Sequence, residues 1–132
     1  MAKNLVDGDS VKIYETGSNI YLETAESGSN ENGSWIKYED GTMICYMKRQ
    51  YNNINITNTW GNVYESPALS LGDLPQTFIE IPMVFAQSTG TTVWVEGIQP
   101  TTTSLGSSYF MRPVSGTNQT INIMFIAIGR WK

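Results

Sequence analysis

Residues 121–132, with the sequence Ile-Asn-Ile-Met-Phe-Ile-Ala-Ile-Gly-Arg-Trp-Lys, decide the fold of this chain. Successive side chains of a β-strand point to opposite faces, and both faces of this stretch are apolar over residues 124–128. One face holds Ile121, Ile123, Phe125 and Ala127, and the other holds Asn122, Met124, Ile126 and Ile128. A chain of this length can cover one face with its own core, and another copy of the chain is the simplest cover for the second. We therefore predict a last strand that is buried or lies in a subunit interface.

The composition indicates one all-β domain with a short appendage. Charged residues make up only 15% of the chain, below the roughly 25% of an average soluble domain. Thr, Ser, Gly and Asn together supply over a third of the residues. Thr favours strands and the other three favour turns. Short apolar runs at turn spacing, with no helical periodicity, predict a β-sandwich of antiparallel sheets.

The charge and the rare residue types exclude several classes of function. The chain has no histidine, one cysteine and a net charge of −4. Without histidine there is no Ser-His-Asp or Cys-His machinery and most zinc sites are ruled out, so we expect no cofactor, no metal and no enzyme. An acidic chain offers no basic surface to nucleic acid or to an anionic membrane. Cys45, inside an apolar run, is expected to be a buried structural thiol.

The start of the chain differs from the rest. No signal peptide and no apolar run near the ~20 residues of a spanning helix is found, so we expect a protein made in the cytoplasm and released by lysis. Residues 1–23 contain two alternating runs that resemble a β-hairpin, and residues 24–34 are typical of a linker or long exposed loop. We predict a neck or attachment segment at 1–31 and a β-sandwich head at 32–132.

Turn residues place the strands of the head. Asp40-Gly41, between the runs 35–38 and 42–47, is a strong hairpin signal because both residues tolerate positive φ. Pro82, inside the run 77–86, predicts an edge strand or a bulge because proline cannot donate to a strand ladder. Further strands are expected at 93–98 and 109–112, an edge strand or long loop at 51–60, and loops or connections at 68–75 and 99–108.

Three stretches, taken in order, resemble a known family. They are Trp35-Ile-Lys-Tyr-Glu-Asp-Gly-Thr-Met-Ile-Cys-Tyr46, Phe78-Ile-Glu-Ile-Pro-Met-Val84 and Ile126-Ala-Ile-Gly-Arg-Trp-Lys132. They resemble an aromatic opening with DGT-x-I-C, an F-x-x-x-P-x-V strand and the ending of C-terminal domains in bacteriophage and prophage tail-fibre or baseplate proteins. The resemblance covers about residues 32–132, and residues 1–31 do not match it.

This resemblance implies a receptor-binding head at the tail tip of a virion. Such heads are compact antiparallel sandwiches, similar in build to H-type lectins, with three copies about one axis. The implied ligand is host cell-wall saccharide or teichoic acid, and residues 1–31 would join the head to other tail or baseplate proteins. A homotrimer agrees with the separate prediction that another copy covers the last strand.

The candidate ligand-binding residues are those whose chemistry suits a glycan. Sugar sites combine an aromatic face with Asp, Asn, Glu or Arg, and Arg also suits a glycerol-phosphate polymer. Residues of these types near the predicted loops are Trp60, Trp94, Glu96, Tyr109 and Arg112. Trp94 and Glu96 share one strand face and are displayed outward if Val93 and Val95 face the core. The alternative for Trp94 is packing in the subunit interface, and for Arg112 an ordinary surface cation or interface salt bridge.

Two other functions stay open. A purely structural trimerisation or attachment domain would have the same fold and oligomer without a ligand. A polysaccharide depolymerase would need two carboxylates roughly 5–10 Å apart in a cleft. Glu80 and Glu96 could meet across neighbouring strands, although each is also what an exposed strand position holds. Trp35 and Trp131 are expected to be structural.

Overall fold

The computed structural model describes residues 23–90 and 92–132, which form eleven strands and no helix. The strands are β1 (Thr24–Asn30), β2 (Gly33–Tyr38), β3 (Thr42–Ile56), β4 (Asn58–Trp60), β5 (Val63–Glu65), β6 (Leu69–Asp73), β7 (Met83–Thr89), β8 (Trp94–Val95), β9 (Ser104–Ser108), β10 (Phe110–Arg112) and β11 (Gly116–Arg130). All their pairings are antiparallel, which confirms the predicted fold class. No helix suited to crossing a membrane occurs in these two ranges.

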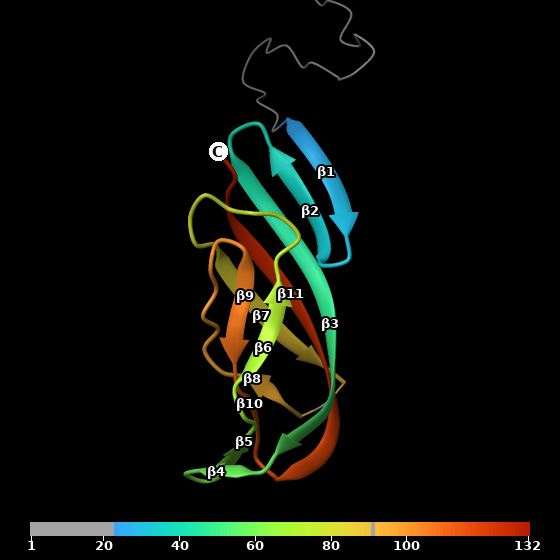
Figure 1. The fold of residues 1–132 in the computed structure, drawn as a ribbon, viewed down its shortest axis with the longest axis vertical. Helices are drawn as coiled ribbons and strands as arrows, with labels where there is room; N and C mark the ends of the chain where they lie inside the picture. Colours follow the sequence, from blue (N-terminus) through green and yellow to red (C-terminus); the bar gives the residue numbers. More distant parts are fainter. Residues whose placement is uncertain (1–22, 91) are drawn as a thin grey trace, which may run out of the picture.

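The strands form a sandwich of two layers. One layer is a five-stranded sheet in the order β1-β2-β3-β11-β7, drawn along the length of the molecule in Figure 1. The other layer consists of a four-stranded sheet, β4-β5-β10-β8, and a two-stranded sheet, β6-β9. The core lies between the layers, because buried residues of β3 and β11 cluster with Leu71 of β6, Leu105 of β9 and Phe110 of β10.

The long antiparallel pair β3 and β11 runs through the whole five-stranded sheet. Its register extends from Thr42 opposite Arg130 to Ile56 opposite Gly116 and is interrupted by two irregularities near the far end. Asn53 and Asn118 have positive φ there, a conformation that Asn tolerates better than most residues. The extra residues bend the two strands there. At this end of the pair β3 leads into β4, and β11 follows β10.

Alternation along β11 agrees with the predicted pattern. Ile121, Ile123, Phe125 and Ala127 are all buried against the second layer. On the other face Met124 and Ile126 are exposed in the single chain. The first cover of the last strand is therefore confirmed, and the second cover by another copy stays a prediction. Cys45 is buried and free, as predicted.

Residues 24–34 are not the predicted linker or loop. They form β1 and the start of β2, with Asn30 opposite Gly33 at the turn. Gly28 lies directly under Trp35, where a Cβ would come within 2.6 Å of the Trp35 Cζ2 atom. The Trp35 indole nitrogen donates to the carboxylate of Glu26 at 3.0 Å. These contacts across the hairpin order a stretch whose composition is that of a loop. The hairpin predicted within residues 1–23 falls almost wholly outside the described residues.

Several predicted elements have different bounds. Residues 51–56, expected at an edge or in a loop, belong to the central strand β3, and the expected loops at 68–75 and 99–108 contain the paired strands β6 and β9. The predicted strand at 93–98 shortens to β8. β7 begins just after Pro82 and is an edge strand, as its proline predicted. Pairing between β6 and β9 joins segments more than thirty residues apart, so no local pattern announces it.

The predicted Asp-Gly hairpin is present and is tied to the chain end. Gly41 has a φ of 95° at the turn between β2 and β3, and its carbonyl accepts from the Trp131 amide at 2.9 Å. The Trp131 indole nitrogen donates to the carbonyl of Tyr38 at 2.8 Å. The Lys132 ammonium lies 4.8 Å from the centre of the Trp131 ring. Trp131 is therefore structural, as expected.

Candidate functional site

Four of the five predicted ligand-binding residues share one face of the four-stranded sheet. Register places Trp94 opposite Met111, Met111 opposite Glu65 and Glu65 opposite Asn58, so these residues point the same way. Side chains two positions away along a strand also share that face. By this rule Trp60, Glu96 and Tyr109 belong to the same face as Trp94.

Trp94, Glu96 and Tyr109 lie next to one another on this face. The Glu96 amide donates to the Tyr109 carbonyl at 3.0 Å, which continues the pairing of β8 with β10. Trp94 is 42% exposed and Tyr109 is 39% exposed, whereas Val93 is buried and Val95 packs against the core. The valines face inward, so the condition for outward display of Trp94 and Glu96 is met. We call Trp94, Glu96 and Tyr109 the aromatic face.

Trp60 stands apart from the aromatic face. It lies on β4, at the opposite edge of the sheet from β8, with β5 and β10 between them. Its side chain is 56% exposed at the end of that strand. A single ligand could contact both Trp60 and the aromatic face only if it extended across the whole small sheet.

Arg112 points to the other face of the sheet and is held within the chain. Its Nη1 atom donates to the Oε1 atom of Gln119 at 2.8 Å, and its guanidinium lies so close to Gly116 that a Cβ there would overlap it. The Nε atom is buried without a hydrogen-bond partner among the described residues. This arrangement fixes the bulged start of β11 and leaves Arg112 separated from the other four residues.

A hollow of about 280 Å³ adjoins the aromatic face. It lies between edge strand β7 and the segment after β8, and its lining residues are Val84, Ala86, Val95, Glu96, Gly97, Ile98 and Pro100. The hydroxyl of Ser108, which is buried, donates to the carbonyl of Glu96. Ser108 thus holds the backbone of Glu96 where the hollow meets the aromatic face.

The two carboxylates considered for a depolymerase, Glu80 and Glu96, lie outside the strands. Glu80 lies in the segment before β7, and Glu96 follows β8. Over residues 23–90 and 92–132 no group of three His, Cys, Asp or Glu side chains could hold a metal ion. The aromatic face can stack on and hydrogen-bond a ligand.

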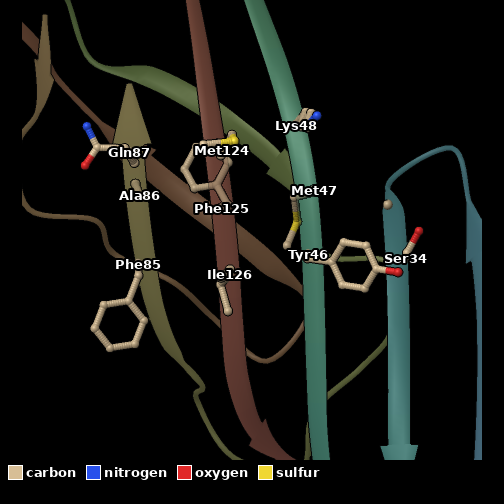
Figure 2. A pocket seen from close by; sticks show the side chains of 11 residues that line it. Ser34, Tyr46, Met47, Lys48, Phe85, Ala86, Gln87, Met124, Phe125 and Ile126 are labelled. Atoms are coloured by element: carbon tan, nitrogen blue, oxygen red, sulfur yellow. The ribbon is translucent and has the colours of Figure 1, made fainter. Parts of the chain in front are cut away.

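A larger hollow lies elsewhere, on the outer face of the five-stranded sheet. It has a volume of about 680 Å³, and Figure 2 shows Tyr46 and Phe85 on either side of Ile126 and Met124. Register explains the arrangement, because Ile126 is paired with Tyr46 of β3 and with Phe85 of β7. We call this hollow the outer groove. The apolar second face of residues 124–128 indicated its floor, but the walls depend on register, which sequence reasoning did not supply.

The outer groove becomes polar at one end. Lys48 and Gln87 flank Met124, and the next row contains Asn122, whose side-chain oxygen accepts from the Gln50 amide at 3.0 Å. Another hollow, of about 450 Å³, adjoins the outer groove at this end. The apolar surface therefore has a definite boundary, as an interface has where its core meets its rim.

No protein-family model and no curated protein matches the chain. Two solved structures are similar to it. An N-truncated R1-type pyocin tail fibre is 19% identical, with a TM-score of 0.48 over 83% of this chain and 86% of that chain. A P. aeruginosa R1 pyocin fibre fragment comprising C-terminal residues 323–701 is 19% identical, with a TM-score of 0.47 over 83% of this chain and 28% of that chain.

Proposed function

We propose that residues 32–132 form a non-catalytic receptor-binding head of a bacteriophage-type tail fibre or baseplate, and that the head binds saccharide or teichoic acid on the bacterial surface. The observation that carries the proposal is the aromatic face. Two exposed aromatic residues, Trp94 and Tyr109, are the neighbours of Glu96 on one face of the sheet. Ring faces stack on the apolar side of a pyranose, and a carboxylate accepts hydrogen bonds from its hydroxyls.

The same proposal is supported by the placement of the three stretches that resemble the tail-fibre and baseplate family, residues 35–46, 78–84 and 126–132, which we call the family-like stretches. They meet at one end of the sandwich. There the Trp131 amide donates a hydrogen bond to the Gly41 carbonyl, and the Ile79 amide donates one to the Arg130 carbonyl, at 2.9 Å each. Gly129 lies against Phe78, whose Cδ1 would be 2.8 Å from a Cβ at that position. These stretches therefore build the frame of the head. The aromatic face is made by other segments, which can vary with the ligand while the frame stays the same.

The proposal includes assembly and location. The chain would form a homotrimer at the tip of a phage tail, and residues 1–31 would attach it to other tail or baseplate proteins. It would need no nucleic acid, membrane or cofactor. A purely structural attachment domain would share the assembly but would not bind the cell wall.

Binding to purified cell walls tests the proposal. The full chain would be titrated against walls from a broad panel of bacteria, with and without extraction of teichoic acid. We expect Trp94→Ala and Tyr109→Ala to weaken binding at least tenfold, because truncated central aromatic contacts cost about 2 kcal/mol or more. Val114→Ala is the matched control, since Val114 is 63% exposed but lies outside the aromatic face.

Two outcomes would contradict the proposal. If the assembled chain bound no wall in the panel, the structural attachment domain would be the better reading. If walls were bound equally well by wild type, Trp94→Ala and Tyr109→Ala, the aromatic face would not be the site. Circular dichroism on each variant shows that a loss of binding is not a loss of folding.

A further inference from the structure

The edge strand of the five-stranded sheet carries an apolar ridge. Ile81, Met83 and Phe85 alternate along one side of β7 and the residues before it, and they are 66%, 63% and 59% exposed. Phe78 and Pro82 are buried beneath this segment, and the Ile79 amide is bonded to the Arg130 carbonyl. The ridge is therefore held firmly by the core while its large side chains face outward.

The outer groove lies directly beside this ridge. Its floor of Met124 and Ile126 runs between Tyr46 on one side and Phe85 on the other. All four side chains are between 41% and 59% exposed. One chain thus presents both a projecting apolar row and an apolar hollow of about 680 Å³.

The exposed apolar area of ridge and groove is at the upper end of what a single chain usually exposes. At these exposed fractions the six side chains of ridge and groove together present roughly 600 Å². The largest patch on a typical monomer is about 300–600 Å², and a stable interface buries about 800 Å² on each partner. In a ring each chain offers its ridge to one neighbour and its outer groove to the other, so about half of this apolar area enters each contact. Surrounding atoms would supply the rest of each interface as a polar rim.

Charge also favours a partner with the surface of this chain. Lys48 is the one charged residue among those that line the outer groove. Exposed Glu80 lies next to Ile81 at the start of the ridge. The ridge therefore has an acidic neighbour and the outer groove a basic lining residue, which are opposite in charge.

We propose that a second copy of this chain covers the outer face of the five-stranded sheet, with the β7 ridge of one copy seated in the outer groove of the next. One such contact covers both apolar surfaces, which a partner that filled the groove alone would not do. The contact joins two different surfaces, so repetition closes a ring if the rotation allows it. The proposal rests on the proposed homotrimer and does not depend on glycan binding.

Solution mass by light scattering is the first test, with the full chain over a range of concentrations. We expect a trimer for wild type and a monomer for Phe85→Glu and for Ile126→Glu, because each would bury an unpaired carboxylate in the contact. Val114→Glu is the matched control and keeps the trimer, since Val114 is as exposed as Met83. A monomeric wild type, or variants that stay trimeric, would overturn the proposal.

Cross-linking distinguishes a ridge in a groove from two like faces in contact. Phe85→Cys chains would be mixed with Tyr46→Cys chains and treated with a short bis-maleimide. Cys45 is buried, and its burial raises the pKa of the thiol to about 11, so wild type should react little. We expect cross-links between unlike variants to exceed those between like variants. An excess of like-with-like cross-links would overturn the arrangement.

The same variants separate this inference from the proposed function. Phe85→Glu and Ile126→Glu leave Trp94, Glu96 and Tyr109 unchanged on the small sheet. A monomeric variant that still binds walls through Trp94, only more weakly because avidity is lost, supports both proposals. If wild type is a trimer, these variants are monomers and no form binds walls, the result supports the proposed interface and contradicts the proposed wall binding.

Discussion

At the scale of single residues, a backbone carbonyl decides what position 106 can hold. Gly106 has a φ of 79° in β9, and a Cβ there would overlap the carbonyl oxygen of Gln99. A side chain would meet both a strained backbone and an atom that cannot rotate away. Gly90 has nearly the same φ, 77°, but a Cβ there would meet no described atom within 4 Å. Comparing substitutions at the two glycines therefore separates the cost of backbone strain from the cost of steric overlap.

We expect Gly90→Ala to cost about 1–2 kcal/mol, the price of a left-handed conformation for a residue with a Cβ. Gly106→Ala should cost about 1–3 kcal/mol more, because the β6-β9 pair must move to admit the methyl group. Urea unfolding of both variants measures the difference. Equal losses in the two variants would show that the approach of Gln99 to Gly106 is not a real constraint on the sequence.

At the scale of elements, one arginine links the turn of the β1-β2 hairpin to the end of β6. The Nη2 atom of Arg49, on β3, donates to the Asn32 carbonyl at 2.7 Å and to the Asp73 carbonyl at 2.8 Å. Asn30 makes a second tie through its side-chain amide to the Pro75 carbonyl at 2.9 Å. The hairpin turn and the end of β6 are thus joined through a third strand, which makes a polar stretch part of the sandwich.

Replacing Arg49 by Met keeps most of its aliphatic stem and removes both hydrogen bonds. We expect a loss of about 2–3 kcal/mol, since hydrogen bonds to a charged group contribute about 1.5–3 kcal/mol each and water recovers part of them. Hydrogen exchange should accelerate in residues 30–34 before it does in the core strands. Lys48→Met is the neighbouring control, and an equal acceleration there would contradict the role of Arg49.

At the scale of the whole molecule, the packing of the layers buries the Cys45 thiol and half-buries the side chain of Tyr51. Burial raises the pKa of the Cys45 thiol from 9.0 to about 11 and that of the Tyr51 hydroxyl from 10.0 to about 12. The Tyr51 hydroxyl donates to the Leu71 carbonyl at 2.8 Å, and its ring lies 5.2 Å from that of Phe110. Both groups therefore ionise more readily when the chain unfolds.

We expect stability to fall in alkali for this reason. Well below pH 9 both groups are protonated whether the chain is folded or not. As the pH rises through 9 to 11 the unfolded chain loses its Cys45 proton first, which favours unfolding by up to about 2.5 kcal/mol. Urea unfolding at pH 8, 9.5 and 10.5 measures this slope. It should be shallower in Cys45→Ala, and an unchanged slope would show that the thiol is not enclosed.

The whole molecule also divides its tasks among surfaces. The three family-like stretches meet at one end, the aromatic face lies on the small four-stranded sheet, and the ridge and outer groove cover the outside of the large sheet. Tyr46, Ile81, Met83 and Ile126 of the ridge and outer groove belong to those three stretches. The aromatic face is made by other segments, so it can be changed without altering the ridge or the groove. This division is why assembly and wall binding can be tested by separate substitutions.

Local pattern was enough to predict the all-β class, the Asp-Gly hairpin, the edge position announced by Pro82 and the inward face of β11. Each depends on a period of two residues or on one turn conformation, both of which are written in consecutive residues. The outward display of Trp94 and Glu96 followed from the same alternation.

Only the tertiary structure decided which segments pair and which faces stay open. Pairing made β1, β6 and β9 out of stretches that were expected to be a linker or loops, and it placed residues 51–56 at the centre of a sheet. It also set Tyr46 and Phe85 on either side of Ile126. Register between strands far apart in the chain depends on the packing of the whole core, and no short stretch of sequence contains that information.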